Sequence, residues 1–169
     1  MILTFAQLTI LKTDIVADPA FALIPMTPDG AFEIAAVYNL NAVPDFWVWR
    51  TSITESECVN TTSVDATTWS WPQYIARSQA ERDGWTALFR TGVVSPAQPN
   101  VRQAVADIFS GAGAAPVAQR THLLTISRRK ATRAEKLFAS GTGSMAAPAT
   151  MGPEGILSYT DVQTARSLP

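Results

Sequence analysis

The sequence predicts an all-α fold, a small helical bundle with an extended C-terminal arm and at most a minor β-hairpin. Apolar residues recur at helical spacing through most of the first 140 residues, and helix start and stop signals separate these stretches. Hydrophobic residues make up 47% of the chain and charged residues 16%, which is enough for a core and argues against global disorder. We therefore expect residues 1–140 to form a helical domain and residues 141–169 to form the arm.

The N-terminal stretch favours a helix over a secretory leader. The helix is expected from about Thr4 to Ala17, with an apolar face formed by Leu3, Phe5, Leu8, Leu11 and Ile15. Lys12 and Asp14 interrupt the apolar run, and no basic segment precedes it. No stretch approaches the roughly 20 apolar residues that a transmembrane helix needs. The chain is therefore expected to be soluble and unexported.

Capping signals mark two further helix starts. Thr27 is placed to cap a helix that has Pro28 at its first position and Phe32 on its apolar side. Thr54, followed three residues later by Glu57, has the pattern of a capping box. The segment VPDFWVWRT between them lacks strict alternation, so a helical turn or a buried loop is expected there instead of a strand.

The second half of the domain is expected to be helical after one β-leaning stretch. Residues 58–71 are rich in Thr and Val and are expected to form a loop or a minor hairpin. Helices are then expected over residues 71–90 and around residues 101–109. The longest helix is expected from Pro116 to about Ser140, where the sequence SGTGS ends it and begins a flexible linker.

No catalytic, cofactor or metal site is predicted, and enzymatic activity is not expected. His122 is the only histidine and has no cluster of ligands around it in sequence, which favours a packed structural histidine. Cys58 is the only cysteine, and its neighbours Glu55 and Glu57 would raise its pKa, which favours an inert thiol over a nucleophile. The glycines of SGTGS follow a helix and lack the lysine of a phosphate-binding loop.

A basic run is the clearest candidate for partner binding. Residues 120–136 hold six of the 13 Lys and Arg residues: Arg120, Arg128, Arg129, Lys130, Arg133 and Lys136. A solvated helix face is the usual explanation of such a run, and the alternative is contact with DNA phosphate or an acidic protein surface. Residues 1–65 carry a net charge of −6 and the remainder +5, a polarity that would permit copies to stack head-to-tail into a ring.

The tryptophans are clustered. Trp47, Trp49, Trp69 and Trp71 lie close together in sequence without interleaved lysines. That pattern favours core packing or a subunit interface over nucleic-acid stacking, and the sequence leaves these two alternatives open.

Segments at both ends of the chain resemble a family of structural proteins of tailed bacteriophages and prophages. They are ADPAF, PDGAFEIAAVYNL and VWRT near the start and TRAEKLFASGTG, PATMGPEG and LSYTDVQTARSL at the end, while residues 54–119 depart more from the family pattern. The resemblance is greatest to the head-to-tail adaptors of short-tailed phages. It implies a mainly helical protein that forms a ring of about twelve copies below the portal. It also implies contact with a tail or nozzle protein, assembly in the host cytoplasm and a final location at the head–tail junction of the virion.

The same resemblance implies roles for both candidate segments. The linker from Gly141 to Gly152 would span a gap, and the arm would dock on the portal through Ile156, Leu157, Tyr159, Val162 and Leu168. The basic run would face the portal or DNA that passes without sequence specificity, and no membrane partner is expected. Two alternatives stay open: another virion role, as a tail-tube or capsid-associated protein, and a small DNA-binding regulator that uses residues 120–136.

Overall fold

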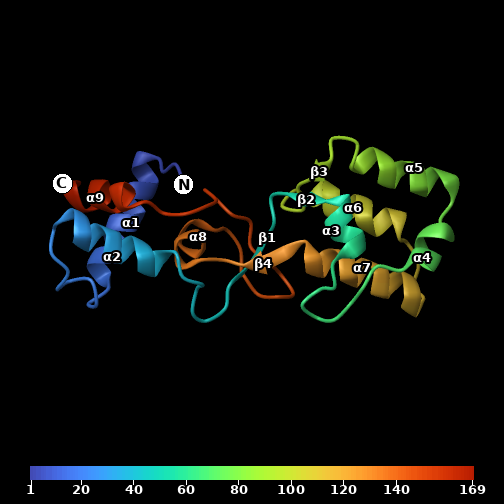
Figure 1. The fold of residues 1–169 in the computed structure, drawn as a ribbon, viewed down its shortest axis with the longest axis horizontal. Helices are drawn as coiled ribbons and strands as arrows, with labels where there is room; N and C mark the ends of the chain where they lie inside the picture. The colour runs from blue at the N-terminus through green and yellow to red at the C-terminus, as the bar shows by residue number, and fades with distance from the viewer. The chain divides into compact units, whose positions relative to one another are not determined.

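The computed structural model describes residues 1–169 and is mostly helical, as expected (Figure 1). Its helices are α1 (Phe5–Ala17), α2 (Pro28–Tyr38), α3 (Glu55–Asn60), α4 (Trp71–Ile75), α5 (Gln79–Leu88), α6 (Pro99–Ile108), α7 (Ala114–Ile126), α8 (Arg133–Phe138) and α9 (Tyr159–Ser167). Its strands are β1 (Trp47–Trp49), β2 (Ile53–Thr54), β3 (Val93–Val94) and β4 (Arg128–Lys130). None of the helices combines the length and the apolar character needed to cross a bilayer.

The strands form two small sheets. β1 pairs with β4, and β2 pairs antiparallel with β3, so that Ile53 lies opposite Val94. The prediction of a turn or loop at β1 is wrong, because a strand of three residues is too short to display alternation in the sequence. No hairpin forms within residues 58–71, where the end of α3 is followed by a loop.

The residues group into two compact units. Unit 1 comprises residues 1–48 and 130–169, and unit 2 comprises residues 49–129. This division differs from the predicted boundary at Gly141. The reason is that helices from both ends of the chain pack together in unit 1.

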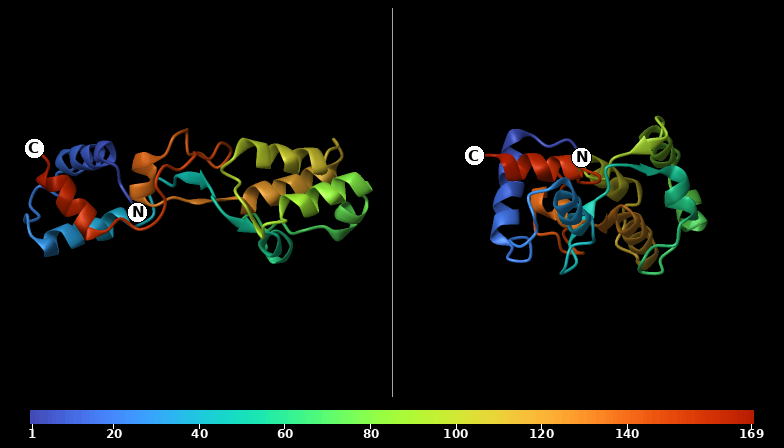
Figure 2. Two further views of the ribbon diagram at one scale, coloured as in Figure 1. Left: turned by 90° about the horizontal axis from the view of Figure 1, so that it is seen from above. Right: turned by 60° about the vertical axis from the view of Figure 1, so that its left-hand side comes forward.

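Within unit 1, α9 packs against both α1 and α2 (Figure 2). The buried core consists of Leu11, Ile15, Phe21, Ala31, Ile34, Ala35, Tyr38, Ala134, Leu157, Val162 and Ala165. Phe5 and Phe32, predicted to lie on buried apolar faces, are instead 70% and 67% exposed. Both helices carry apolar residues on more than one face, so periodicity alone does not select the face that is buried.

Unit 2 encloses an aromatic core. Trp85 is buried, and its ring centroid lies 5.1 Å from that of Trp69 and 5.8 Å from that of Phe109. Trp71 packs edge-on against Trp69 at the margin of this cluster and is 54% exposed. Trp85 and Trp69 therefore serve as core in unit 2, with Trp71 at the surface.

Capping signals predicted from the sequence are confirmed. The Thr27 hydroxyl accepts a hydrogen bond from the Gly30 amide, with Pro28 at the first position of α2. At α3 the Thr54 hydroxyl accepts from the Glu57 amide, and the Glu57 carboxylate accepts from the Thr54 amide at 2.9 Å. Hydrogen bonds from Arg50 and from this amide lower the pKa of Glu57.

Two long helices predicted from the sequence are broken in the structure. The helix expected over residues 71–90 is divided into α4 and α5, and Ser78 caps the second piece. The helix expected over residues 116–140 is divided into α7, β4 and α8. Thr132 and Glu135 form a capping box at the start of α8, which satisfies the free amides of a new helix start.

Candidate functional site

The segment expected as a flexible linker is held in place by backbone hydrogen bonds in unit 1. Ser140 and Thr150 exchange two such bonds, each 2.8 Å long, and the Trp47 amide donates to the Gly143 carbonyl at 2.7 Å. Gly143 has φ +66, and a Cβ at this position would lie 2.0 Å from the Phe46 ring. Glycine is therefore needed at position 143 for close packing, a demand that a free linker would not make.

The predicted docking residues of the arm separate into buried and exposed groups. Leu157 and Val162 belong to the core of unit 1, and Leu168 is half-buried. Ile156 is 74% exposed and Tyr159 is 46% exposed. Of the five predicted docking residues, only Ile156 and Tyr159 are exposed in this fold.

The segment before α9 is fixed to α2 by one amide side chain. Asn39 Nδ2 donates to the Leu157 carbonyl at 2.9 Å, and the Leu157 amide donates to Asn39 Oδ1 at 2.8 Å. Ser158 then caps α9 by accepting from the Asp161 amide. The exposed Ile156 and Tyr159 are therefore carried on a firmly anchored segment.

Arg133, a member of the basic run, joins three elements of unit 1. Its Nη2 lies 3.2 Å from Asp14 Oδ2 in α1 and 2.8 Å from Asp18 Oδ2 just after α1. Its guanidinium carbon lies 4.6 Å from the ring centroid of Tyr38 in α2. The hydrogen bond that Arg133 donates is the main cause of the lowered pKa of Asp18. The hydrogen bond from the Ala20 amide lowers this pKa further. Arg133 is therefore engaged inside its own unit.

The Tyr38 hydroxyl completes this cluster by donating to Asp14. Burial raises the pKa of Tyr38, and the hydrogen bond to the Asp14 carboxylate raises it further. Tyr38 is thus a neutral hydrogen-bond donor at physiological pH. The cluster connects α1, α2 and α8 and is structural.

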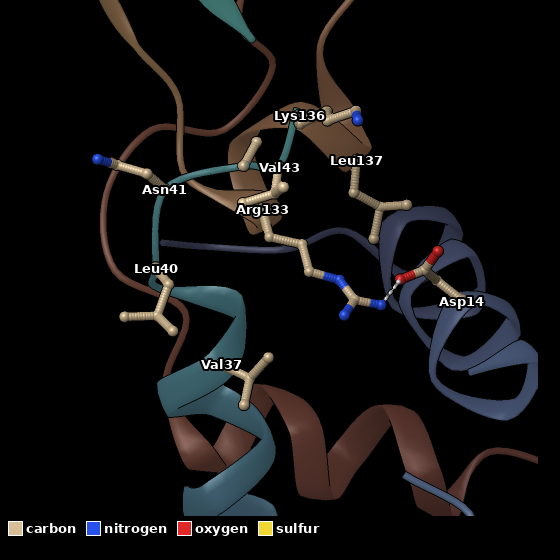
Figure 3. A pocket seen from close by; sticks show the side chains of 9 residues that line it. Asp14, Val37, Leu40, Asn41, Val43, Arg133, Lys136 and Leu137 are labelled. Carbon is tan, nitrogen blue, oxygen red and sulfur yellow. Dashed lines mark hydrogen bonds and ion pairs between the residues drawn. The ribbon is translucent and has the colours of Figure 1, made fainter. Parts of the chain in front are cut away.

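A hollow of about 540 Å³ opens beside this cluster (Figure 3). Its lining is Asp14, Val37, Leu40, Asn41, Ala42, Val43, Arg133, Lys136 and Leu137. The Lys136 ammonium lies 5.8 Å from the Phe46 ring centroid. The volume lies within the range of ligand sites. The lining is mostly apolar, its Asp14 and Arg133 pair with each other, and Lys136 is its other cation.

The remaining members of the basic run are distributed over different elements. Arg128 pairs with Asp65 at 2.9 Å, and Lys130 pairs with Asp45 at 2.7 Å. Arg120 donates to the backbone carbonyls of Phe109 and Gly111 at the end of α6. The predicted single basic helix face does not form, because α7 ends before β4 and Arg128, Lys130 and Arg133 pair with carboxylates from other segments of the chain.

Charge is also redistributed by the fold. Unit 1 carries a net charge of −3 and unit 2 a net charge of +2. The polarity has the same sense as in the sequence halves but is smaller. The reduction arises because residues 49–65, with a net charge of −2, lie in unit 2, and residues 130–169, with a net charge of +1, lie in unit 1.

Exposed apolar side chains are concentrated on unit 1. It holds twelve of the seventeen large hydrophobic residues that are exposed: Ile2, Phe5, Ile10, Val16, Leu23, Met26, Phe32, Leu40, Val43, Met145, Ile156 and Tyr159. Soluble monomers rarely expose large contiguous apolar areas.

The only histidine and cysteine lie together inside unit 2. His122 is fully buried; its Nε2 lies 2.9 Å from the Cys58 carbonyl oxygen and its Nδ1 3.2 Å from Thr67 Oγ1. Burial, with added repulsion from Glu57 and Glu55, raises the pKa of the Cys58 thiol to about 12. A thiol with such a pKa is a poor nucleophile, and the histidine ring links α7 to α3 and the following loop.

Sequence reasoning missed the outward face of α1 and the start of α8. The start of α8 is signalled by Thr132 and Glu135, whose spacing is that of a capping box. The outward face of α1 is signalled by apolar residues around most of the helix, a distribution typical of a helix covered on more than one side.

Neither the family models, nor the curated proteins, nor the solved structures with which the chain was compared include a match.

Proposed function

We propose that this protein is a virion structural protein, a head-to-tail adaptor that assembles as a ring below the portal and joins it to the tail. The observation that carries the proposal is the concentration of exposed apolar side chains on unit 1. A protein that works only in an assembly needs such a surface, whereas an independent monomer does not. The likeness of both ends of the sequence to phage structural proteins supports the same proposal.

The contact with the portal is assigned to Ile156 and Tyr159. Both are exposed, and both are held by the Asn39 and Ser158 contacts that fix the start of α9. Leu157 and Val162 support this docking segment from inside unit 1. A preorganised segment loses less conformational entropy on binding than a free arm.

The alternative of a DNA-binding regulator has less support. It requires a continuous basic face over residues 120–136, but Arg128 and Arg133 are ion-paired with carboxylates and α7 ends before them. Phosphate contacts would have to replace these pairs. Another virion role, in the tail tube or on the capsid, shares the apolar surface and differs in its neighbours.

The test is assembly on the portal of the same phage, followed by light scattering and negative-stain microscopy. Truncation at Gly141 is a poor variant, because it also removes Leu157 and Val162 from the core. The informative variant is Ile156→Lys with Tyr159→Lys, and the matched control is Ile75→Lys, at a side chain of unit 2 that is 65% exposed.

The proposal predicts a ring on the portal for the natural protein and for the Ile75→Lys control. The double variant should lose attachment while keeping its helical circular dichroism. A natural protein that stays indifferent to the portal would overturn the adaptor function. Attachment that survives the double variant would overturn the assignment of the contact to α9.

A further inference from the structure

Two carboxylates of the chain have no partner, and they lie one turn apart on α2. Asp29 and Glu33 are exposed, and neither takes part in a hydrogen bond or an ion pair, whereas every other carboxylate has a partner. Asp29 lies in the first turn, where the helix dipole favours a negative charge, but Glu33 lies beyond that turn. Like charges at this spacing repel each other, and a cation placed between them would remove the repulsion.

An uncovered aromatic ring lies beside these carboxylates. Phe32 is 67% exposed, and Ala36, one turn further along α2, is exposed as well. Together with Asp29 and Glu33 they occupy one continuous arc of about 100° on the helix. We call these four residues the α2 face. A partner that fits this face carries a cation and an apolar side chain close together.

Unit 2 presents such a pair of side chains in the turn after α5. Arg90 is exposed and is the one arginine of the chain with no hydrogen bond, ion pair or ring contact. The turn is closed by the Gly92 amide, which donates to the Phe89 carbonyl at 2.8 Å, and Val93, which follows it, is 47% exposed. Nothing lies within 4 Å of the place that a Cβ of Gly92 would occupy, so the tip of the turn is open. We call residues 90–93 the Arg90 turn.

The chemistry of the Arg90 turn matches that of the α2 face. A guanidinium carries five N–H donors in a planar fork, so one arginine can serve two carboxylates a helical turn apart. It is also attracted to the face of an aromatic ring such as that of Phe32. The ammonium of Lys136 makes no hydrogen bond either, but it already lies 5.8 Å from the Phe46 ring centroid. Arg90 is therefore the better partner for the α2 face.

We propose that neighbouring copies of the chain contact each other through these two surfaces, with the Arg90 turn of one copy packed on the α2 face of the next. The net charges agree with this sense, since unit 1, which holds the α2 face, carries −3 and unit 2 carries +2. The two surfaces differ, so each copy keeps one of them open after the first contact. Such a heterologous contact repeats from copy to copy and forms a ring when the rotation closes.

The inference rests on the proposed function for the ring, and it names the contact between the copies of that ring. The contact is polar and exposed, so it is weak and sensitive to salt in the free protein. On a portal, copies bound side by side meet at a high effective concentration, and a weak contact is then sufficient to order them.

The experiment is light scattering and sedimentation velocity of the purified full chain over a hundredfold range of concentration. The mean mass should rise above 18.2 kDa with concentration at about 0.1 M salt and fall back at about 1 M, where charges are screened beyond about 3 Å. Glu33→Arg and Arg90→Glu should each weaken the association by about tenfold or more, because each sets like charges opposite one another. Both should keep the helical circular dichroism of the natural protein.

Two further samples test the pairing itself. The double variant Glu33→Arg with Arg90→Glu should associate again, because both charges are exchanged. An equimolar mixture of the two single variants should associate as well, because the surfaces of one complement those of the other. The matched control is Asp107→Arg, which makes the same change of net charge as Glu33→Arg at an exposed carboxylate of α6 and should associate like the natural protein.

A mass of 18.2 kDa at every concentration and salt would overturn the proposal, as would an Asp107→Arg protein that associates as poorly as Glu33→Arg. Rescue in the double variant without rescue in the mixture would place the contact within one chain and overturn it too. Rescue of Glu33→Arg by Lys136→Glu in place of Arg90→Glu would overturn the choice of Arg90.

Attachment to the portal, measured on the same variants, separates this inference from the proposed function. A natural protein that associates with itself but ignores the portal would overturn the proposed function and leave the contact between copies in place. Rings that form on the portal as readily with Glu33→Arg as with the natural protein would overturn the contact and leave the proposed function in place.

Discussion

Replacement of Leu157 by Ala tests directly whether the C-terminal segment is part of the folded unit or a free arm. Leu157 is 1% exposed and lies in the core of unit 1, although it is distant in sequence from its neighbours in α1 and α2. The adjacent Ile156 is 74% exposed and provides the matched control, Ile156→Ala. If the segment were a free arm, the two substitutions would have the same small effect.

The size of the effect follows from burial. Removal of a fully buried leucine side chain beyond Cβ costs about 2–5 kcal/mol, made up of lost transfer free energy and the cavity that remains. An exposed substitution such as Ile156→Ala costs about 0.5 kcal/mol or less. Domains of this size have a free energy of unfolding of about 5–15 kcal/mol, so Leu157→Ala removes a large part of the stability of unit 1.

The assay is urea unfolding followed by far-UV circular dichroism at 222 nm. With a loss of about 3 kcal/mol and a denaturant slope of about 2 kcal/mol per M, the midpoint should fall by about 1.5 M in Leu157→Ala. Ile156→Ala should shift it by less than about 0.3 M. Equal midpoints for the two variants would refute the packing of α9 on α1 and α2.

Three further predictions concern the interior clusters. His122→Ala removes a fully buried ring and its two hydrogen bonds, so the free energy of unfolding should fall by about 2–4 kcal/mol in thermal or urea unfolding; an unchanged midpoint would contradict the buried position. The Cys58 thiol, with a pKa of about 12, should resist a thiol reagent at about pH 8 in the native protein and react promptly in urea; rapid native reaction would show that the site is open. Arg133→Met should lower the melting temperature at about pH 7. Arg133 lowers the pKa of Asp18, so their ion pair adds to the free energy of unfolding at pH values above the ordinary carboxyl pKa. This contribution is lost as pH falls through the lowered pKa. The difference in melting temperature between Arg133→Met and the natural protein should therefore shrink at about pH 3. A difference that stays constant with pH would assign the role of Arg133 to packing alone.

Local signals predicted much of the secondary structure because they depend on neighbouring residues only. Thr27 with Pro28 and Thr54 with Glu57 start helices as predicted, since a capping side chain acts on amides two or three residues away. The direction of the Cys58 pKa shift was also predictable from its adjacent glutamates, although burial is its larger cause. Thr132 and Glu135 have the spacing of a capping box in the sequence as well. One helix was nevertheless predicted through them, because the basic run appears continuous.

The candidate sites depended on contacts that are distant in sequence. Arg133 is part of a basic run in the sequence, but Asp14 and Asp18 pair with it only because α1 packs near α8. Leu157 and Val162 resemble exposed docking residues until α1 and α2 cover them. No local pattern distinguishes an apolar residue that docks on a partner from one that docks on the far end of its own chain.

By itself, the sequence determined that the chain is mostly helical, where several helices begin and that a core could form, because propensity, capping and composition act locally or in sum. Only the tertiary structure decided which face of α1 is buried, that the C-terminal segment belongs to unit 1, and that basic residues of the run form separate ion pairs with carboxylates distant in sequence. The physical reason is that burial and pairing are properties of surfaces brought together by folding. A helix such as α1, apolar on several sides, acquires an inner and an outer face only when its neighbours are in place.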